Sequence, residues 1–409
     1  MLRLFNTLGR KMEPFRPVNE KVIHLFTCGP SVYQRSHIGN FRTFLFEDIL
    51  VRYLEYKGHR VQRGMNLTDV EDKAIEEAEK RDIPLRRLTQ KNIDHFVREM
   101  NLLRMKRPQY LPRASEAIDE TVEIIRRLLN RGVAYWHGGN VYFDSLKYAR
   151  FGELYGLDMK RWPKKKKRFH KDTYPGMRWN LGDFILWHGK GKAGTIGWDT
   201  IIGRGRPSWN IQDPSLIFKY CQETLSIYCG GIDNLYRHHD YSRAILESIR
   251  PYPMSRFWLH SEHLMVNGQK MSKSRGNIIY TDDLVRKGYT PEEIRFFLIH
   301  GHYRERQDYS DRAFRLAAER WRGFARTIKK LARKVDETIE PDRMTLRRLK
   351  NLFERNMDDD LNVRGAFDAL LEDLLKTGPE NVKPKVASGI VHALKEIDQV
   401  LRIMRLAKD

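Results

Sequence analysis

The stretch covering residues 22–48 constrains the fold of this chain more than any other part of the sequence. Its apolar beginning, residues 22–26, is typical of a buried parallel strand, and a Cys-Gly-Pro turn and a polar loop come next. From His37 onward, apolar side chains at helical spacing indicate an amphipathic helix. A strand, a loop and a helix N-terminus in this order predict an anion site, because unpaired amides and the positive end of the helix dipole meet there.

Two residues at the expected helix N-terminus suit a bound nucleotide. His37 can donate a hydrogen bond to phosphate oxygens, and Gly39 lets a flat ring or a backbone lie close. Much later in the chain, Lys270 and Lys273 lie on a segment rich in Gly and Ser. Such a loop can close over a triphosphate and neutralise the charge that develops as pyrophosphate leaves. Each segment alone has a plainer interpretation. His37 can be a structural histidine, and the lysine segment can be a solvated basic loop.

Taken together, the two segments resemble the two signatures of class I aminoacyl-tRNA synthetases, with Asn40 where the first usually ends in histidine. Further segments resemble one family of that class, the cysteinyl-tRNA synthetases. They are CGP at 28–30, NLTDVEDK at 66–73, DFILW at 183–187, GRPSW at 205–209, GGID at 230–233, HH at 238–239 and MDDDLN at 357–362. The resemblance implies a Rossmann-type α/β catalytic domain with a connective insertion, followed by a C-terminal α-helical bundle. It also implies an enzyme that forms an aminoacyl-adenylate from ATP and an amino acid and passes the aminoacyl group to an acceptor.

The resemblance and the pattern of expected elements divide the chain into five parts. These parts are residues 1–111, the first half of the nucleotide-binding catalytic domain; 112–198, the connective insertion; 199–260, the second half of the catalytic domain; 261–305, the stem-contact region with the lysine loop; and 306–409, the helical bundle. In the second half, a helix is expected at 214–223 and a strand at 224–228. Asp233, just past that strand, is placed to accept hydrogen bonds from ribose hydroxyls.

The resemblance also assigns roles to particular residues. His37 and Asn40 would hold phosphates, and Lys270 and Lys273 would stabilise the reacting phosphorus, with Mg²⁺ on the triphosphate. No nucleophile or general base is required of the protein, because positioning and electrostatics carry this reaction. The residues expected to line the ATP and aminoacyl-adenylate pocket are Cys28, Gly29, Pro30, Ser31, Gly39, Thr43, Asn66, Thr68, Trp209, Gly231, Asp233 and Leu264.

The amino-acid pocket departs from the family pattern. In cysteinyl-tRNA synthetases a zinc ion bound by two Cys, one His and one Glu selects cysteine through its thiolate. Cys28 and His238 stand at two of these positions, whereas Asp213 replaces the second cysteine and Ser242 replaces the glutamate. Zinc could still be held by Cys28, Asp213 and His238. The residues expected around the amino-acid side chain are Cys28, Thr68, Trp209, Asp213 and His238.

Asp213 also permits a second interpretation, in which the metal is absent. A carboxylate that faces the pocket is costly to bury unpaired, so it should meet a cation or a hydrogen-bond donor. We therefore hypothesise that the activated amino acid is not cysteine but carries a hydroxyl or an amine within reach of Asp213 and His238. Without the metal, a pocket distinguishes cysteine from serine by only about 1 to 3 kcal/mol.

The charge balance favours a nucleic-acid partner. The 75 Lys and Arg residues outnumber the 53 Asp and Glu residues, and the resulting net charge of +22 attracts polyanions such as tRNA. The densest basic run, residues 160–171, interleaves aromatic side chains with the charges, as single-stranded nucleic-acid binders do. An exposed loop explains this run equally well.

Three functions stay open at this point. The chain can be a tRNA ligase, a ligase of an amino acid with a small-molecule amine, like the mycothiol-pathway cysteine ligase that it also resembles, or a non-catalytic RNA-binding paralogue. The sequence stops after the expected bundle, without the anticodon-reading C-terminal domain of bacterial cysteinyl-tRNA synthetases, which fits the first two. It has no long apolar run, no signal-peptide core and only three cysteines, so we expect a cytoplasmic protein without membrane contact. The oligomeric state does not follow from the sequence.

Overall fold

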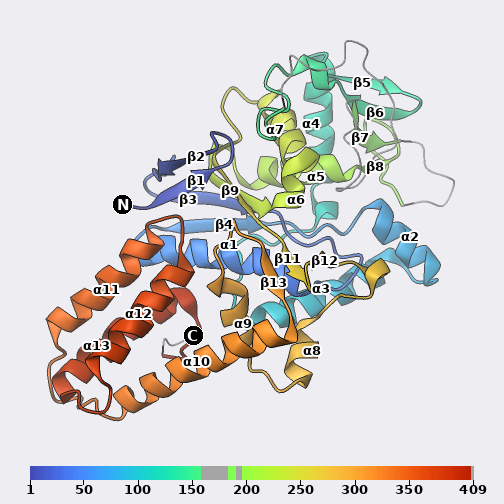
Figure 1. The fold of residues 1–409 in the computed structure, drawn as a ribbon. Coiled ribbons are helices and arrows are strands. Elements are labelled where there is room, and N and C mark those ends of the chain that lie inside the picture. Colours follow the sequence, from blue (N-terminus) through green and yellow to red (C-terminus); the bar gives the residue numbers. More distant parts are fainter. Residues whose placement is uncertain (158–182, 190–195, 407–409) are drawn as a thin grey trace.

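The structure is a computed structural model that describes residues 1–157, 183–189 and 196–406 (Figure 1). The basic run at 160–171 lies outside these ranges, and the side chain of Lys273 is also outside the description. None of the helices in these ranges combines the length and the apolar composition that crossing a bilayer requires.

The centre of the molecule is a parallel sheet with the strand order β10-β9-β3-β4. Its strands are β3 (Ile23–Thr27), β4 (Val61–Met65), β9 (Leu225–Gly231) and β10 (Ser255–Ser261). The chain leaves β3 toward β4 on one side and leaves β9 toward β10 on the other, so the strand order reverses between β3 and β9. In such sheets ligands bind beside the carboxyl ends of the strands at the point of reversal.

Helices of the first half of the chain flank this sheet. They are α1 (Ile38–Tyr56), α2 (Asp72–Lys80) and α3 (Leu85–Leu102). The apolar face of α1 is buried, and its Phe41 and Phe44 rings pack against Phe96 of α3. A short antiparallel pair, β1 (Arg3–Asn6) and β2 (Lys11–Pro14), lies beside β10.

The segment between the two halves forms an antiparallel sheet of its own (Figure 1). Its strands, in spatial and chain order, are β5 (Ala134–His137), β6 (Asn140–Phe143), β7 (Phe184–His188) and β8 (Arg206–Pro207). Gly138 and Gly139 supply the positive φ angles of the β5–β6 turn, 57° and 83°. The helices that pack with this sheet around a second apolar core are α4 (Ile118–Asn130), α5 (Trp209–Tyr220) and α7 (Asp240–Glu247).

Helix α5 begins earlier than the sequence suggested, so the expected start at residue 214 is wrong. Ser208 caps the helix by accepting a hydrogen bond from the amide of Asn210, and Trp209 is the first helical residue. Pro214 therefore lies inside the helix, where its missing N–H removes one backbone hydrogen bond. As a consequence Trp209 and Asp213, four residues apart, lie on one face of α5.

The C-terminal part adds a small sheet in the order β12-β11-β13 and a bundle of helices. The elements are β11 (Leu264–Val266), β12 (Gln269–Lys270), α8 (Thr281–Arg286), α9 (Pro291–His300), β13 (Gln307–Tyr309), α10 (Asp311–Ala332), α11 (Arg343–Met357), α12 (Val363–Thr377) and α13 (Pro384–Leu401). Arg295 of α9 connects α13 of the bundle to helix α1. Its buried guanidinium donates to Asp48 of α1 (2.6 Å) and to the Leu401 carbonyl of α13 (2.7 Å).

A second buried ion pair leads to a prediction on stability. Arg63 of β4 donates to Glu47 of α1 at 2.8 Å, and both side chains are buried. Burial raises the pKa of Glu47 to about 7, against the opposing effect of Arg63. Arg63→Met should lower the free energy of unfolding by about 3 to 5 kcal/mol at a pH of about 8, because an ionised Glu47 is then left without its cation.

The loss of unfolding free energy in Arg63→Met should be smaller at a pH of about 5.5. The raised pKa keeps most of Glu47 protonated in the folded protein there. The stability contributed by the protonated form is complete below the ordinary glutamate pKa of 4.5 and is lost progressively as the pH rises from there through about 7. Urea unfolding at both pH values measures the difference. The double variant Glu47→Gln, Arg63→Met is the control and should recover most of the loss, whereas equal losses at both pH values would contradict the prediction.

Candidate active site

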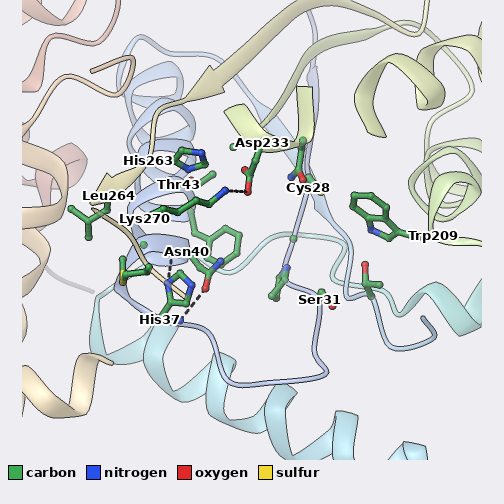
Figure 2. A pocket seen from close by; sticks show the side chains of 18 residues that line it. Cys28, Ser31, His37, Asn40, Thr43, Trp209, Asp233, His263, Leu264 and Lys270 are labelled. Carbon is green, nitrogen blue, oxygen red and sulfur yellow. Dashed lines mark hydrogen bonds and ion pairs between the residues drawn. The ribbon is translucent and has the colours of Figure 1, made fainter. Parts of the chain in front are cut away.

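A cavity of about 240 Å³ opens at the carboxyl ends of β3 and β9 (Figure 2). The loop after β3, the start of α1, the start of α5, the end of β9 and the β11–β12 hairpin all contribute to it. Its lining residues are Cys28, Gly29, Pro30, Ser31, His37, Gly39, Asn40, Thr43, Phe44, Thr68, Trp209, Gly231, Asp233, Asn234, His263, Leu264, Lys270 and Met271. Of the residues expected at the site, Asn66, Asp213 and His238 lie behind this lining, and the side chain of Lys273 is not described.

Two cavity side chains cap the N-terminus of α1. Nδ1 of His37 accepts a hydrogen bond from the amide of Asn40 (3.4 Å), and Oδ1 of Asn40 accepts one from the amide of His37 (3.0 Å). Burial lowers the pKa of His37 to about 4, so the imidazole is neutral at neutral pH. Because Nδ1 accepts, the ring carries its proton on Nε2 and can donate it to an anion.

Gly39 allows the lysine loop to pack against this helix end. A Cβ atom on Gly39 would lie 2.6 Å from Cε of Met271 and 3.0 Å from the His37 ring. The absence of a side chain therefore lets Met271, the residue after Lys270, approach the first turn of α1. This contact holds the lysine loop and the helix N-terminus at one cavity.

Lys270 and Asp233 face each other across the cavity (Figure 2). Nζ of Lys270 lies 3.6 Å from Oδ2 of Asp233, and both side chains are about half exposed. Asp233 belongs to the short helix α6 (Ile232–Asn234) directly after β9. An ion pair this exposed contributes little stability, so both charges can turn to other partners when a ligand enters.

The cavity wall beside Cys28 is positioned from behind by Asn66. The buried Asn66 accepts a hydrogen bond at Oδ1 from the amide of Gly29 (2.5 Å) and donates from Nδ2 to Oγ1 of Thr68 (3.0 Å). The wall residues are thus held at fixed positions by a side chain that does not line the cavity itself.

Three buried side chains lie together at the base of the cavity. The potential ligand atoms of Cys28, Asp213 and His238 all lie within 4.8 Å of one another, and Nε2 of His238 is 3.2 Å from Oδ2 of Asp213. The His238 ring stacks on Trp209 with the ring centres 4.1 Å apart, which joins the cluster to the cavity lining. Burial, followed by the charge of Asp213, raises the pKa of the Cys28 thiol well above its usual value. The Ser242 hydroxyl donates to the carbonyl of His238 at 2.8 Å.

Sequence reasoning missed part of the lining. The missed residues are Phe44, Asn234, His263 and Met271. Chain proximity could have found them, because Met271 follows Lys270 and Phe44 lies one helical turn after Asn40.

The fold is that of one class of enzyme, the class I aminoacyl-tRNA synthetases. In this chain a reversal point in a parallel sheet, a histidine at a helix N-terminus and the loop that carries Lys270 meet at one cavity. The fold is similar to that of Mycobacterium tuberculosis methionyl-tRNA synthetase in complex with methionyl-adenylate, with a TM-score of 0.68 and 15% sequence identity. The match covers 94% of this chain and 91% of that one.

Within this class, the chain belongs to the cysteinyl-tRNA synthetase family. A family profile described as tRNA synthetases class I (C) catalytic domain matches residues 14–319. The chain is 34% identical to a cysteine–tRNA ligase of Chlamydia pneumoniae, over 99% of this chain and 87% of that protein. It is also 34% identical to one of Thermococcus onnurineus, over 91% of this chain and 79% of that protein. The chain is therefore an ATP-dependent ligase of the aminoacyl-tRNA synthetase type, and the family, fold class and enzyme class expected from the sequence are confirmed.

The close approach at Gly39 leads to a prediction on ATP binding. Gly39→Ala should raise the KM for ATP in ATP–pyrophosphate exchange roughly 5- to 150-fold, because the methyl group would push Met271 and the His37 ring from their places in the cavity lining, a shift that costs about 1 to 3 kcal/mol when ATP must bind there. Folding should change little, because the nearest atom, Cε of Met271, is the end of a flexible side chain. The matched control is Gly323→Ala in α10, where a Cβ meets no atom within 4 Å. An unchanged KM for ATP in the Gly39→Ala variant would remove Gly39 from the nucleotide site.

Proposed function

We propose that the cavity binds ATP and an amino acid, joins them into an aminoacyl-adenylate with release of pyrophosphate, and passes the aminoacyl group to the 3′ end of tRNA. The observation that supports this proposal most is the meeting of two distant segments. His37 and Lys270, which the sequence separates widely, line one cavity together with Asp233. A donor, a cation and an acid placed in this way match the phosphates and the ribose of ATP.

In this proposal the triphosphate lies between the helix N-terminus and the lysine loop. Nε2–H of His37 and the positive end of the α1 helix dipole hold phosphate oxygens. Oδ1 of Asn40 serves the capping box, which leaves its Nδ2 group to donate to phosphate. Lys270 and Lys273 neutralise the charge that grows on the departing pyrophosphate, and Mg²⁺ binds the triphosphate.

The nucleoside lies against the glycines of the cavity. Gly39 and Gly231 present bare backbone to it, so a flat base and a ribose can come close. Asp233 accepts hydrogen bonds from the ribose hydroxyls once Lys270 turns from it toward the phosphates. Because Lys270 and Asp233 are half exposed and only weakly paired, separating them costs little free energy.

We also propose that Cys28, Asp213 and His238 hold a zinc ion. All three residue types are zinc ligands, and catalytic zinc sites use three protein ligands and leave a fourth position to substrate or water. Their potential ligand atoms are close enough to share one ion. Oδ1 of Asp213 is buried and has no hydrogen-bond partner among the described residues, a deficit that a cation would remove. Zinc would supply a Lewis acid that prefers a thiol to a hydroxyl.

The proposed amino acid is accordingly cysteine, which the names of the relatives specify for those proteins. Cys28, Thr68 and Trp209 line the part of the cavity next to the cluster. This proposal takes the place of the metal-free interpretation, in which a side-chain hydroxyl or amine of the substrate meets Asp213. The support for it is that the three potential ligands converge from the turn after β3, from α5 and from the helical segment Leu235–His239 before α7.

The proposed acceptor is tRNA, and the reaction is placed in the cytoplasm. Besides the net charge of +22, helix α10 offers a row of cations. Arg326, Lys329 and Arg333 follow one another at helical spacing at its C-terminal end, are exposed, and form no ion pair within the described part of the chain. Unpaired cations on one helix face are suited to a phosphate backbone.

Substitution of the lysine loop tests the adenylation step. The unmodified protein should catalyse ATP–pyrophosphate exchange with cysteine, and Lys270→Ala should reduce the rate by about 10²- to 10³-fold, as removal of a transition-state charge partner does. The control Lys287→Ala removes an exposed lysine that pairs with Asp311 at 2.5 Å and should leave exchange unchanged. Exchange supported only by an amino acid with a hydroxyl or an amine would favour the metal-free interpretation. RNA binding without any exchange would favour the non-catalytic paralogue.

Charge reversal on α10 tests the acceptor. The combined variant Arg326→Glu, Lys329→Glu, Arg333→Glu should weaken tRNA binding and lower the slope of log affinity against log salt by roughly one for each phosphate that is no longer neutralised. Exchange should be unaffected, because α10 is not part of the cavity lining. Lys376→Glu on α12, a lysine already paired with Glu372 at 2.6 Å, is the control. A protein that acylates a small amine but not tRNA would refute this part of the proposal.

A further inference from the structure

We propose that Tyr228 is a positioning residue for the zinc ligand Asp213, and that this chain therefore uses a Tyr–Asp pair where a cysteine ligand would need no partner. The inference rests on the zinc site of the proposed function. Tyr228 lies on β9 and Asp213 on α5, and both side chains are fully buried. The Tyr228 hydroxyl donates to Oδ2 of Asp213 at 2.6 Å.

Because of this hydrogen bond, the two oxygens of the Asp213 carboxylate have different roles. Oδ2 accepts from Tyr228 and faces Nε2 of His238 at 3.2 Å. Oδ1 is buried and has no hydrogen-bond partner among the described residues. A buried carboxylate oxygen without a partner is costly, so one oxygen is anchored to the protein while the other is left for a cation.

The ring of Tyr228 is rigidly held, so its hydroxyl has little freedom. It stacks on Phe26 with ring centres 5.9 Å apart, meets His239 edge-on at 4.6 Å, and contacts Trp258 at 5.0 Å. Both Tyr228 and Phe26 come from neighbouring strands of the central sheet. Through the Tyr228 hydroxyl, the central sheet therefore helps to set the position of the Asp213 carboxylate.

The chemistry of the two possible ligands explains why such an anchor is needed here. A cysteine offers a single sulfur atom, whereas an aspartate offers two oxygens on a carboxylate that can rotate. Residues that hydrogen-bond to a metal ligand fix its orientation, and their loss commonly weakens metal binding ten- to a hundredfold. Tyr228 should matter only as long as residue 213 is an aspartate.

The test is a double-mutant cycle read out as zinc affinity, measured by competition with a chromophoric chelator. Tyr228→Phe should weaken zinc binding by about 10- to 100-fold. In the Asp213→Cys background the same change should alter the zinc affinity by less than about twofold, because no carboxylate remains to be oriented. The absorption spectrum of the Co²⁺-loaded protein should also change with Tyr228→Phe alone and not in the Asp213→Cys background.

The matched control is Tyr303→Phe. This tyrosine is also buried and its hydroxyl donates to a carboxylate, Asp360, at 2.7 Å, outside the cavity lining. Removal of the Tyr303 hydroxyl should leave zinc affinity unchanged. Unfolding of the metal-free variants in EDTA shows whether Tyr228→Phe folds as well as Tyr303→Phe does.

The possible failures can be told apart. Unchanged zinc affinity in Tyr228→Phe, or an equal loss in both backgrounds, overturns the positioning role. If Asp213→Cys binds no zinc, the positioning role is judged by comparing the zinc affinities of Tyr228→Phe and Tyr303→Phe alone. Exchange activity in a protein that binds no zinc overturns the metal site and this inference with it, but leaves adenylation intact. The absence of exchange with any amino acid overturns the proposed function itself.

Discussion

The pairing of β3 with β9 is the contact on which the rest of the site depends. Leu25 lies opposite Ile227, and the amide of Cys28 donates to the carbonyl of Cys229 at 3.0 Å. Because successive side chains of a strand point to opposite faces, a slip of one residue would turn the neighbours of the cavity away from it. The two strands come from different halves of the chain. Their pairing therefore creates the reversal point of the sheet and sets the helix N-terminus of α1 beside Asp233.

Charges are arranged differently in the core and in the cavity. In the core, the pairs Arg63–Glu47 and Arg295–Asp48 are fully buried, at 2.8 and 2.6 Å. Such pairs hold elements in one geometry, because separating them would leave a buried charge without compensation. In the cavity, by contrast, Lys270 and Asp233 are half exposed and 3.6 Å apart. The charges in the cavity are thus loosely paired, whereas the charges that position the scaffold are tightly paired and buried.

The parts of the structure that were predictable are those with a local cause. The strand before the Cys-Gly-Pro turn and the helix after His37 follow from short apolar patterns, and both are present as β3 and α1. The start of α5 was not predictable in this way. Pro214 suggests a first helical turn, but the Ser208 cap and the stacking of Trp209 on His238 decide the outcome. The capping role of Asn40 was also missed, because a hydrogen bond to the backbone leaves no separate mark in the sequence.

The sequence by itself determined the family and the fold class, because residue identity and order are sufficient for these. It also showed that Asp213 departs from the family pattern, although not what that aspartate contacts. Only the tertiary structure decided that Asp213 accepts from Tyr228 and approaches Cys28 and His238, and that Met271 rests on Gly39. These distances depend on how α5 and the lysine loop pack on the sheet. Contacts of this kind join residues far apart in the chain, and no local pattern specifies them.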